Sequence, residues 1–190
     1  MAACKKNAAR RGAHIVFVDE SGFLLIPILR RTWARCGHTP HVYHRYRHDR
    51  ISVISGVSIS PQRHRLGLYF RCHRHNIRHP EVCGFLRHLL QHLRGPVIVV
   101  WDNASIHKGE PIAALLRRFP RLDIEFLPPY APELNPDEGV WANAKGRLAN
   151  GRPDDIAVLH QRLYATLRGI KHSPPRLRRC VRQTPLSLFL

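Results

Sequence analysis

The sequence predicts a single α/β domain in which helices flank a five-stranded mixed sheet. Its 190 residues fit one domain, and a hydrophobic content of 44% is enough for a buried core. Two short runs, 14–18 and 96–102, are apolar, rich in β-branched and aromatic residues, and do not alternate. That pattern is typical of strands buried on both faces. Runs with helical periodicity alternate with strands in the second half of the chain, which indicates a sheet covered by helices.

The order of the elements refines this class. The predicted strands are runs bounded by turn residues: 14–18, 51–60, 65–72, 96–102 and 122–126. The predicted helices repeat apolar residues at helical spacing: 79–94, 108–118, 135–150 and 153–168. The short connection after the second strand predicts that the first three strands form an antiparallel meander. This order is that of the ribonuclease H-like fold, whose first and fourth strands lie adjacent and parallel at the centre.

The remaining segments lie outside this core, which we expect at residues 14–170. Residues 1–13 are short and basic, so we expect them to be disordered. We expect residues 23–35 and 41–47 to form an outlying hairpin or insertion. Residues 171–190 read as a basic tail interrupted by prolines.

Two of the predicted buried strands end abruptly in an acid, Asp19 and Asp102, each followed by turn-prone residues. If the two strands are parallel neighbours, both carboxylates lie at the same edge of the sheet, where sites in such folds tend to form. Together with Glu138 they would make an oxygen-rich site of the kind that suits Mg²⁺ or Mn²⁺. Taken singly, each aspartate is better explained as a turn former at the end of a strand.

The stretch 127–145 is expected to set the position of the third acid, Glu138. Its first half is rich in proline and cannot form regular structure, whereas its second half starts a helix. Asn135 is a good N-cap, Pro136 suits the first helical position, and Glu138 brings negative charge to the positive end of the helix dipole. The alternative is a capping box, in which Glu138 only reaches back to the amide of Asn135.

Charge indicates a nucleic-acid partner. The formal net charge is +18, from 31 Lys and Arg against 13 Asp and Glu. Such an excess provides affinity for phosphates that does not depend on base sequence. The cations that we expect to contact DNA are Arg30, Arg31, Arg35, Arg45, Arg47 and Lys145. A solvated basic surface without a ligand is the alternative for these residues.

Other functional classes receive little support. The five cysteines are scattered and odd in number, which fits reduced thiols. A cluster of Cys and His at 72–83 raises the question of zinc, but its spacing matches no usual zinc pattern. No run is long enough to span a membrane and no signal peptide is evident, so we expect a cytoplasmic protein.

Four blocks in this order resemble the DDE transposases of bacterial insertion sequences in the Tc/mariner superfamily. They read DESGF at 19–23, RTWARCGHTP at 31–40, WDNASIH at 101–107 and LPPYAPELNPDE at 127–138. Trp141 and Lys145 follow the last block, which is the most specific of the four. The spacing of 35 residues between Asp102 and Glu138 is close to the family's usual gap. Asp137 departs from the family, which usually has an apolar residue there.

The resemblance implies that Asp19, Asp102 and Glu138 are the catalytic acids that hold two Mg²⁺ or Mn²⁺ ions. It also implies cleavage and strand transfer on DNA, with transposon ends and target as partners, and a homodimer on paired ends. Asn103 is expected to shape the loop after its strand. His107 is expected either to orient water or phosphate or to make a plain hydrogen bond near the site.

Family members usually carry helix-turn-helix DNA-binding domains ahead of the catalytic domain, and thirteen residues are too few to encode one. A fragment, a separately made N-terminal half and a frame change are three open explanations. Two alternatives to a transposase also stay open. One is a truncated, non-catalytic DNA-binding remnant, and the other is a structure-selective nuclease of the same fold.

Overall fold

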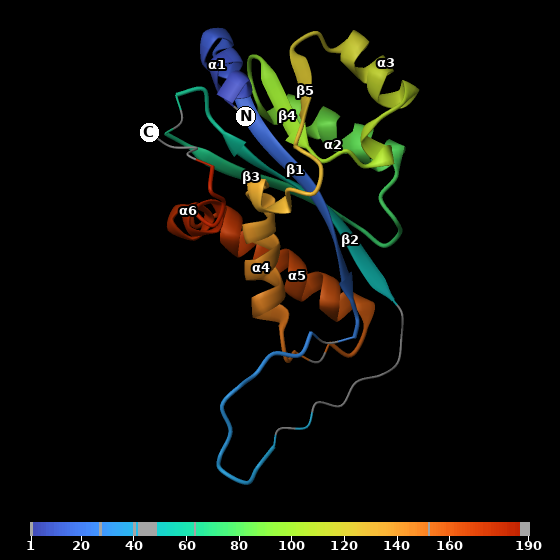
Figure 1. The fold of residues 1–190 in the computed structure, drawn as a ribbon. Coiled ribbons are helices and arrows are strands. Elements are labelled where there is room, and N and C mark those ends of the chain that lie inside the picture. Colours follow the sequence, from blue (N-terminus) through green and yellow to red (C-terminus); the bar gives the residue numbers. More distant parts are fainter. Residues whose placement is uncertain are drawn as a thin grey trace.

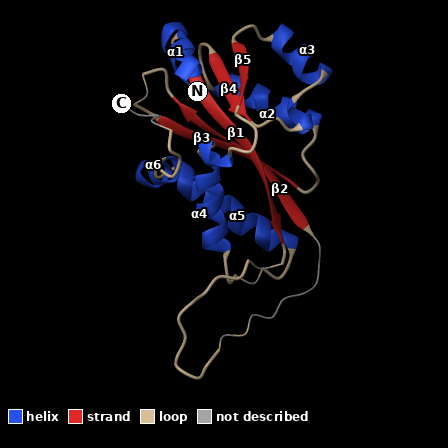
Figure 2. Cartoon of the chain, viewed as in Figure 1, coloured by secondary structure: helices blue, strands red, loops and turns tan. Residues whose placement is uncertain are grey.

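The structure is a computed structural model that describes residues 2–26, 28–39, 41, 49–62, 64–151 and 153–186. One sheet runs through the molecule, with helices on both faces (Figures 1 and 2). Its strands lie in the order β3 (Leu66–His73), β2 (Arg50–Ile59), β1 (His14–Leu24), β4 (Val97–Trp101) and β5 (Leu122–Phe126). In the described ranges, no helix is long and apolar enough to cross a membrane.

The central pair of strands confirms the predicted topology. β1 pairs in parallel with β4, and β4 in parallel with β5, whereas β1–β2 and β2–β3 are antiparallel. The β1–β4 ladder ends with Phe17 opposite Val100. Asp102 directly follows β4, and the same register continued by two residues leads to Asp19, which lies within β1 because that strand runs on to Leu24. The fold is thus the mixed five-stranded arrangement that the sequence predicts.

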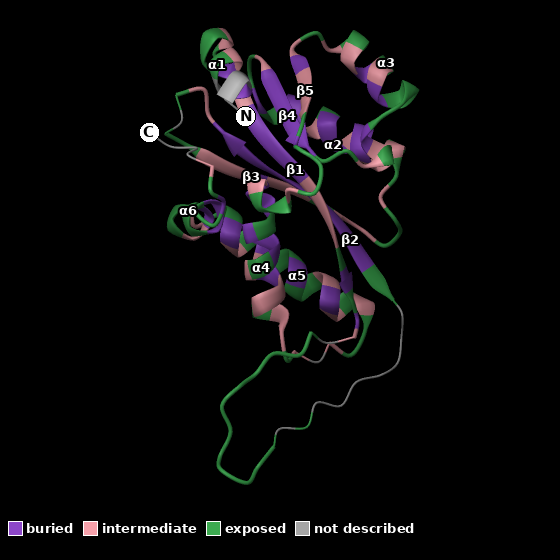
Figure 3. Ribbon diagram, viewed as in Figure 1, coloured by how far each residue is buried: buried purple, intermediate pink, exposed green. Residues whose placement is uncertain are grey.

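Side chains of β1 alternate between two apolar cores, one on each face of the sheet. Ile15 and Phe17 belong to the core beneath α4 (Asp137–Leu148), α5 (Ile156–Lys171) and α6 (Pro174–Val181). Val16 and Val18 belong to the core beneath α2 (His79–His92) and α3 (Glu110–Arg118). All four side chains are buried, and the middle of β1 is covered on both faces (Figure 3). This explains why the run shows no polar alternation.

The predicted disorder at 1–13 is wrong for most of that segment, since residues 2–11 form helix α1 (Ala2–Arg11). The small side chains of Cys4 and Ala8 are buried in the same core as Phe17. Small side chains allow a helix to approach closely while adding little to the hydrophobic signal of the sequence. An ion pair of Arg11 with Asp123, just inside β5, holds the end of the helix.

Two further expectations change. The segment 171–190 is not simply a tail, because α6 forms within it and buries Leu177, Cys180 and Val181. The first arm of the predicted hairpin does not form. Its first two residues belong to β1, which continues to Leu24, and residues 28–39 contain no strand. The second arm, 41–47, lies outside the described residues except for residue 41.

Gly139 lets α6 rest against the start of α4. A Cβ atom at this position would overlap the carbonyl oxygen of Cys180 and lie 2.8 Å from its carbonyl carbon. Because these are backbone atoms of α6, they cannot give way unless the helix moves. Glycine is therefore required here for close approach, one residue after Glu138.

We predict that Gly139→Ala lowers the free energy of unfolding by about 1–3 kcal/mol, the usual cost of overpacking a core. Urea denaturation measures this change. The matched control is Gly84→Ala in α2, where the nearest atom to a new Cβ is the Nη1 of Arg71 at 3.7 Å. There we expect no loss, or a gain of up to about 1 kcal/mol, because alanine favours the helix. Equal effects in the two variants would contradict the packing described for Gly139.

Candidate active site

All three predicted acids line one cleft of about 440 Å³ at the carboxyl end of β4, beside the middle of β1. Asp19 comes from β1, Asp102 directly follows β4, and Glu138 lies in the first turn of α4. The other wall is the proline loop, with Pro128, Pro129, Tyr130 and Pro132 among its lining residues. Elements far apart in sequence thus bring the three acids to a common space.

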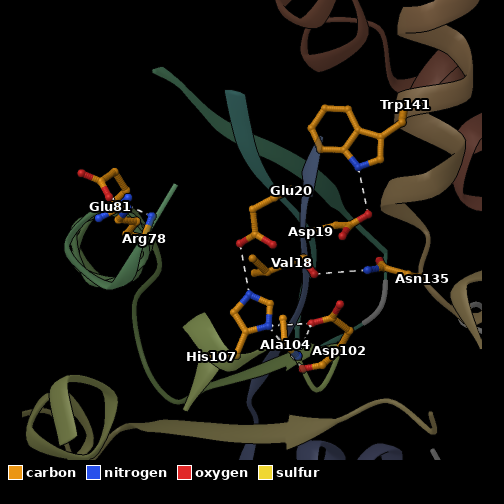
Figure 4. A network of polar contacts seen from close by, with 10 residues as sticks. All are labelled: Val18, Asp19, Glu20, Arg78, Glu81, Asp102, Ala104, His107, Asn135 and Trp141. Atoms are coloured by element: carbon orange, nitrogen blue, oxygen red, sulfur yellow. Dashed lines mark hydrogen bonds and ion pairs between the residues drawn. The ribbon is translucent and has the colours of Figure 1, made fainter. Parts of the chain in front are cut away.

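Trp141 fixes the orientation of Asp19. Its indole Nε1 donates a hydrogen bond of 2.9 Å to Asp19 Oδ2 (Figure 4). Burial raises the pKa of Asp19 to about 7, with help from the neighbouring charges of Glu20 and Glu138, although the Trp141 hydrogen bond acts in the opposite direction. A carboxyl group with such a pKa is about half protonated near neutral pH. A cation in the cleft would relieve the repulsion and favour the ionised form.

Asp102 is held by the loop that follows its strand. Its Oδ1 accepts a hydrogen bond from the backbone N–H of Ala104 at 2.9 Å and lies 2.7 Å from Nδ1 of His107. Both contacts engage the same oxygen, and the side chain as a whole is exposed. Asp102 is therefore fixed through Oδ1.

His107 links the loop after β4 to β1. The imidazole is buried and stacks on the Trp101 ring, with centroids 4.2 Å apart and planes 6° from parallel. Its Nδ1 faces Asp102 and its Nε2 lies 3.1 Å from Oε1 of Glu20 (Figure 4). Burial alone would lower the pKa of His107, but the hydrogen bond and charge of Glu20 and the charge of Asp102 outweigh it and raise the pKa. A protonated imidazole donates to both carboxylates at once.

Two asparagines fasten the loops around the cleft. Asn103 Nδ2 donates to the carbonyl of Leu127 at 3.2 Å, which ties the loop after β4 to the proline loop. Asn135 Nδ2 donates to the carbonyl of Val18 at 3.2 Å, and its Oδ1 accepts from the N–H of Asp137 at 3.1 Å. Asn135 therefore joins the start of α4 to the end of the β1 core, directly beside Asp19.

Asp137 and Glu138 are neighbours in sequence, but the first is buried and the second is exposed. Asp137 is completely buried, accepts a hydrogen bond of 2.7 Å from Ser55 Oγ on β2, and is not among the residues that line the cleft. Burial raises its pKa well above the ordinary value. Glu138 is exposed and lines the cleft. The capping box does not form, because the amide of Asn135 donates to the carbonyl of Pro132 at 2.8 Å. Glu138 is thus the acid that faces the cleft.

The donor set fits divalent cations that prefer oxygen ligands, since three carboxylates from three elements share the cleft. In this conformation, no group of three or more His, Cys, Asp or Glu side chains within the described ranges is close enough to hold a metal ion. That statement applies to the three acids and also to the Cys and His cluster at 72–83. Burial raises the pKa of Cys72 to about 11, which makes it a poor zinc ligand.

The predicted DNA-contacting cations lie in different settings. Arg30, Arg31 and Arg35 are exposed on the segment 28–39, and Lys145 is half-buried on α4. Arg45 and Arg47 lie outside the described residues.

Sequence reasoning missed the roles of Glu20, Asn135 and Trp141 beside the site. A polar partner for Trp141 could have been predicted, because a buried indole N–H usually has a hydrogen-bond acceptor. Glu20 offered none, since its partner is His107, which follows 87 residues later.

Comparison with solved structures identifies similar folds. A chain of the Mos1 strand transfer complex matches with a TM-score of 0.60 and 19% identity, over 97% of this chain and 59% of that chain. The catalytic domain of Mos1 mariner transposase matches with a TM-score of 0.52 and 17% identity, over 95% of this chain and 92% of that one. A chain of the simian T-cell lymphotropic virus intasome, in complex with PP2A regulatory subunit B56 gamma, matches with a TM-score of 0.55 and 12% identity, over 85% and 49%.

These likenesses concern the fold, and this chain spans about three fifths of the Mos1 chain in the strand transfer complex. A search of curated proteins finds no match. The sequence profile described as DDE superfamily endonuclease, however, matches residues 14–159, which is most of the chain and includes all three acids of the cleft. The chain therefore belongs to the DDE superfamily endonucleases.

Proposed function

We propose that this domain cleaves DNA and transfers DNA strands in transposition, as the catalytic part of a Tc/mariner-type transposase from a bacterial insertion sequence. The observation that carries the proposal is the convergence of Asp19, Asp102 and Glu138 on one cleft in a chain of the DDE superfamily endonucleases. The similar Mos1 structures include strand transfer and paired-end complexes. We infer transposon ends and target DNA as substrates, and a homodimer and a separate helix-turn-helix part as partners.

Asp19, Asp102 and Glu138 would hold two divalent ions, Mg²⁺ or Mn²⁺. Mos1 paired-end complexes have been solved with each of these metals. When bound, such ions activate the attacking water or 3′-hydroxyl and stabilise the leaving oxygen. The carboxylates supply charge and geometry, which account for most of the catalysis in phosphoryl transfer.

The residues around the acids orient them. The Trp141 indole directs one oxygen of Asp19 toward the helix, so the other is available to the cleft. The Ala104 amide and the His107 ring together hold Oδ1 of Asp102. His107 acts as a positioning residue in this scheme, since both of its nitrogens are engaged by carboxylates.

We predict that Asp102→Asn and Glu138→Gln each abolish nicking of supercoiled plasmid in Mg²⁺ or Mn²⁺, while DNA binding persists. The matched control is Asp137→Asn, which changes the neighbouring acid in the same way. Burial raises the pKa of this carboxyl and so favours its neutral form, and the neutral amide should keep the Ser55 bond and the activity. Loss of activity in Asp137→Asn with retention in Glu138→Gln would reverse the assignment of the third acid.

We also predict that Mn²⁺ affinity rises with pH up to about 7. The pKa of Asp19 is raised to about 7, so a bound proton competes with the metal below that pH. Affinity should increase up to about tenfold per pH unit from pH 5 to 7 and then level off. Calorimetry in two buffers with different ionisation enthalpies measures both the affinity and the released proton. Asp19→Asn should bind weakly with a flatter pH profile, and an unchanged profile would exclude Asp19 as a ligand.

The same assays separate the alternatives. A non-catalytic remnant would bind DNA but neither Mn²⁺ nor Mg²⁺ in the cleft, and would not nick plasmid. A structure-selective nuclease would cut branched DNA in preference to duplex and would not join strands. Strand joining to a target plasmid by the wild type, and its loss in Asp102→Asn, is the outcome that the transposase proposal requires.

A further inference from the structure

The segment 28–39 is fastened to the end of α4 by one residue, Asn150. The Asn150 Oδ1 accepts from the backbone N–H of Arg30 at 2.9 Å, and its Nδ2 donates to the backbone carbonyl of Arg30 at 3.0 Å. The backbone N–H of Asn150 donates to the carbonyl of Ile28 at 2.9 Å. A single side chain thus pairs with both polar groups of the Arg30 backbone, as a neighbouring strand would. We call these three bonds the Asn150 clasp.

The local backbone suits asparagine. Asn150 has a φ of 57°, in the left-handed region that asparagine tolerates better than most residues. It lies two residues beyond α4, so its position is set by a helix that also carries Glu138. The clasp therefore joins Arg30 to the element that positions the third acid.

The clasp places the Arg30 side chain against α4 at Gly146. A Cβ atom there would lie 3.1 Å from Nη1 of Arg30 and 3.6 Å from its Cζ, so the guanidinium packs closely on the helix backbone. Arg30 is exposed, and among the ion pairs of the described ranges none includes it. A fixed, exposed guanidinium without an acidic partner is suited to an oxyanion, which it can bind through two parallel N–H groups.

Arg30 lies at a defined distance from the cleft. Gly146 follows Glu138 by eight residues, which corresponds to about 12 Å along the helix axis. That distance equals three to four base-pair steps of about 3.4 Å in duplex DNA. The segment 28–39 leaves the body of the molecule beyond this end of α4 (Figure 1), so duplex lying along α4 would pass Arg30.

We propose that Asn150 is a positioning residue that holds Arg30 as a fixed ligand for a backbone phosphate, three to four nucleotides from the bond placed at Glu138. This inference rests on the proposed function, because it takes DNA as the substrate. The simpler alternative is that the clasp only anchors the loop. The two differ in what happens to DNA binding when Arg30 or Gly146 is changed while the clasp is kept.

The test measures binding of a fluorescent duplex by anisotropy, without divalent metal, as a function of salt concentration. Arg30→Ala should weaken binding about tenfold at low salt and reduce the slope of log K against log salt by about 0.9, the value for one lost phosphate contact. Asn150→Gly keeps the left-handed backbone but removes both side-chain bonds, and should shift the slope in the same direction. An unchanged slope in Arg30→Ala would overturn the proposal.

Double variants show whether Asn150 acts through Arg30. Arg30→Ala combined with Asn150→Gly should bind no more weakly than Arg30→Ala alone. The matched control is Arg31→Ala, since Arg31 is exposed on the same segment but lies outside the clasp. The loss of DNA-binding free energy in Arg31→Ala should add fully to the loss in Asn150→Gly. If the binding losses of Arg30→Ala and Asn150→Gly were instead fully additive in the double variant, Asn150 would have a structural role only.

Gly146→Ala keeps the clasp and favours the helix, but crowds the guanidinium. It should weaken DNA binding without lowering the melting temperature, whereas an anchoring role predicts no change in binding. Failure of the wild type to bind DNA would overturn both this inference and the proposed function. DNA binding and metal-dependent nicking by the wild type, with a slope unaffected by Arg30→Ala, would overturn this inference alone.

Discussion

The parallel pairing of β1 with β4 is the constraint on which the rest of the site depends. The ladder stops at Phe17 and Val100, and two residues further lie Asp19, still within β1, and Asp102, directly after β4. Both strands are buried on both faces, so a one-residue slip in their register would exchange side chains between the two cores and disrupt the packing of both. The free energy of the core thus sets the spacing of two charged groups, which by themselves would move apart.

The third acid depends on that pair through polar contacts. Asn135 bonds the carbonyl of Val18, and Trp141 bonds the carboxylate of Asp19, so α4 is tied to β1 on both sides of Glu138. Trp141 is also one of the largest buried side chains of the core. Trp141 therefore serves both the packing of the core and the orientation of Asp19. A change that loosens the core under α4 would also change the electrostatics of Asp19.

The sequence predicted what rests on local pattern and failed where contacts are distant. The buried runs that lead into Asp19 and Asp102, the proline-rich loop and the helix start predicted the sheet order and the acids that line the cleft, although β1 runs on past Asp19 to Leu24. Helix α1 was missed because Cys4 and Ala8 bury little apolar area each. The burial of Asp137 could not be foreseen, since its partner Ser55 lies 82 residues earlier on another strand. The contact of Arg30 with Asn150 joins residues 120 apart, and no periodicity records such a pair.

The packing of α6 on Gly139 also concerns the order in which the chain is made. Ribosomal synthesis proceeds from the N-terminus, so all three acids are polymerised before the residues of α6. Until Leu177, Cys180 and Val181 emerge and dock, the helix that carries Glu138 lacks the part of its packing that α6 provides. The packing that supports Glu138 is therefore complete only after residues made later than all three acids have docked.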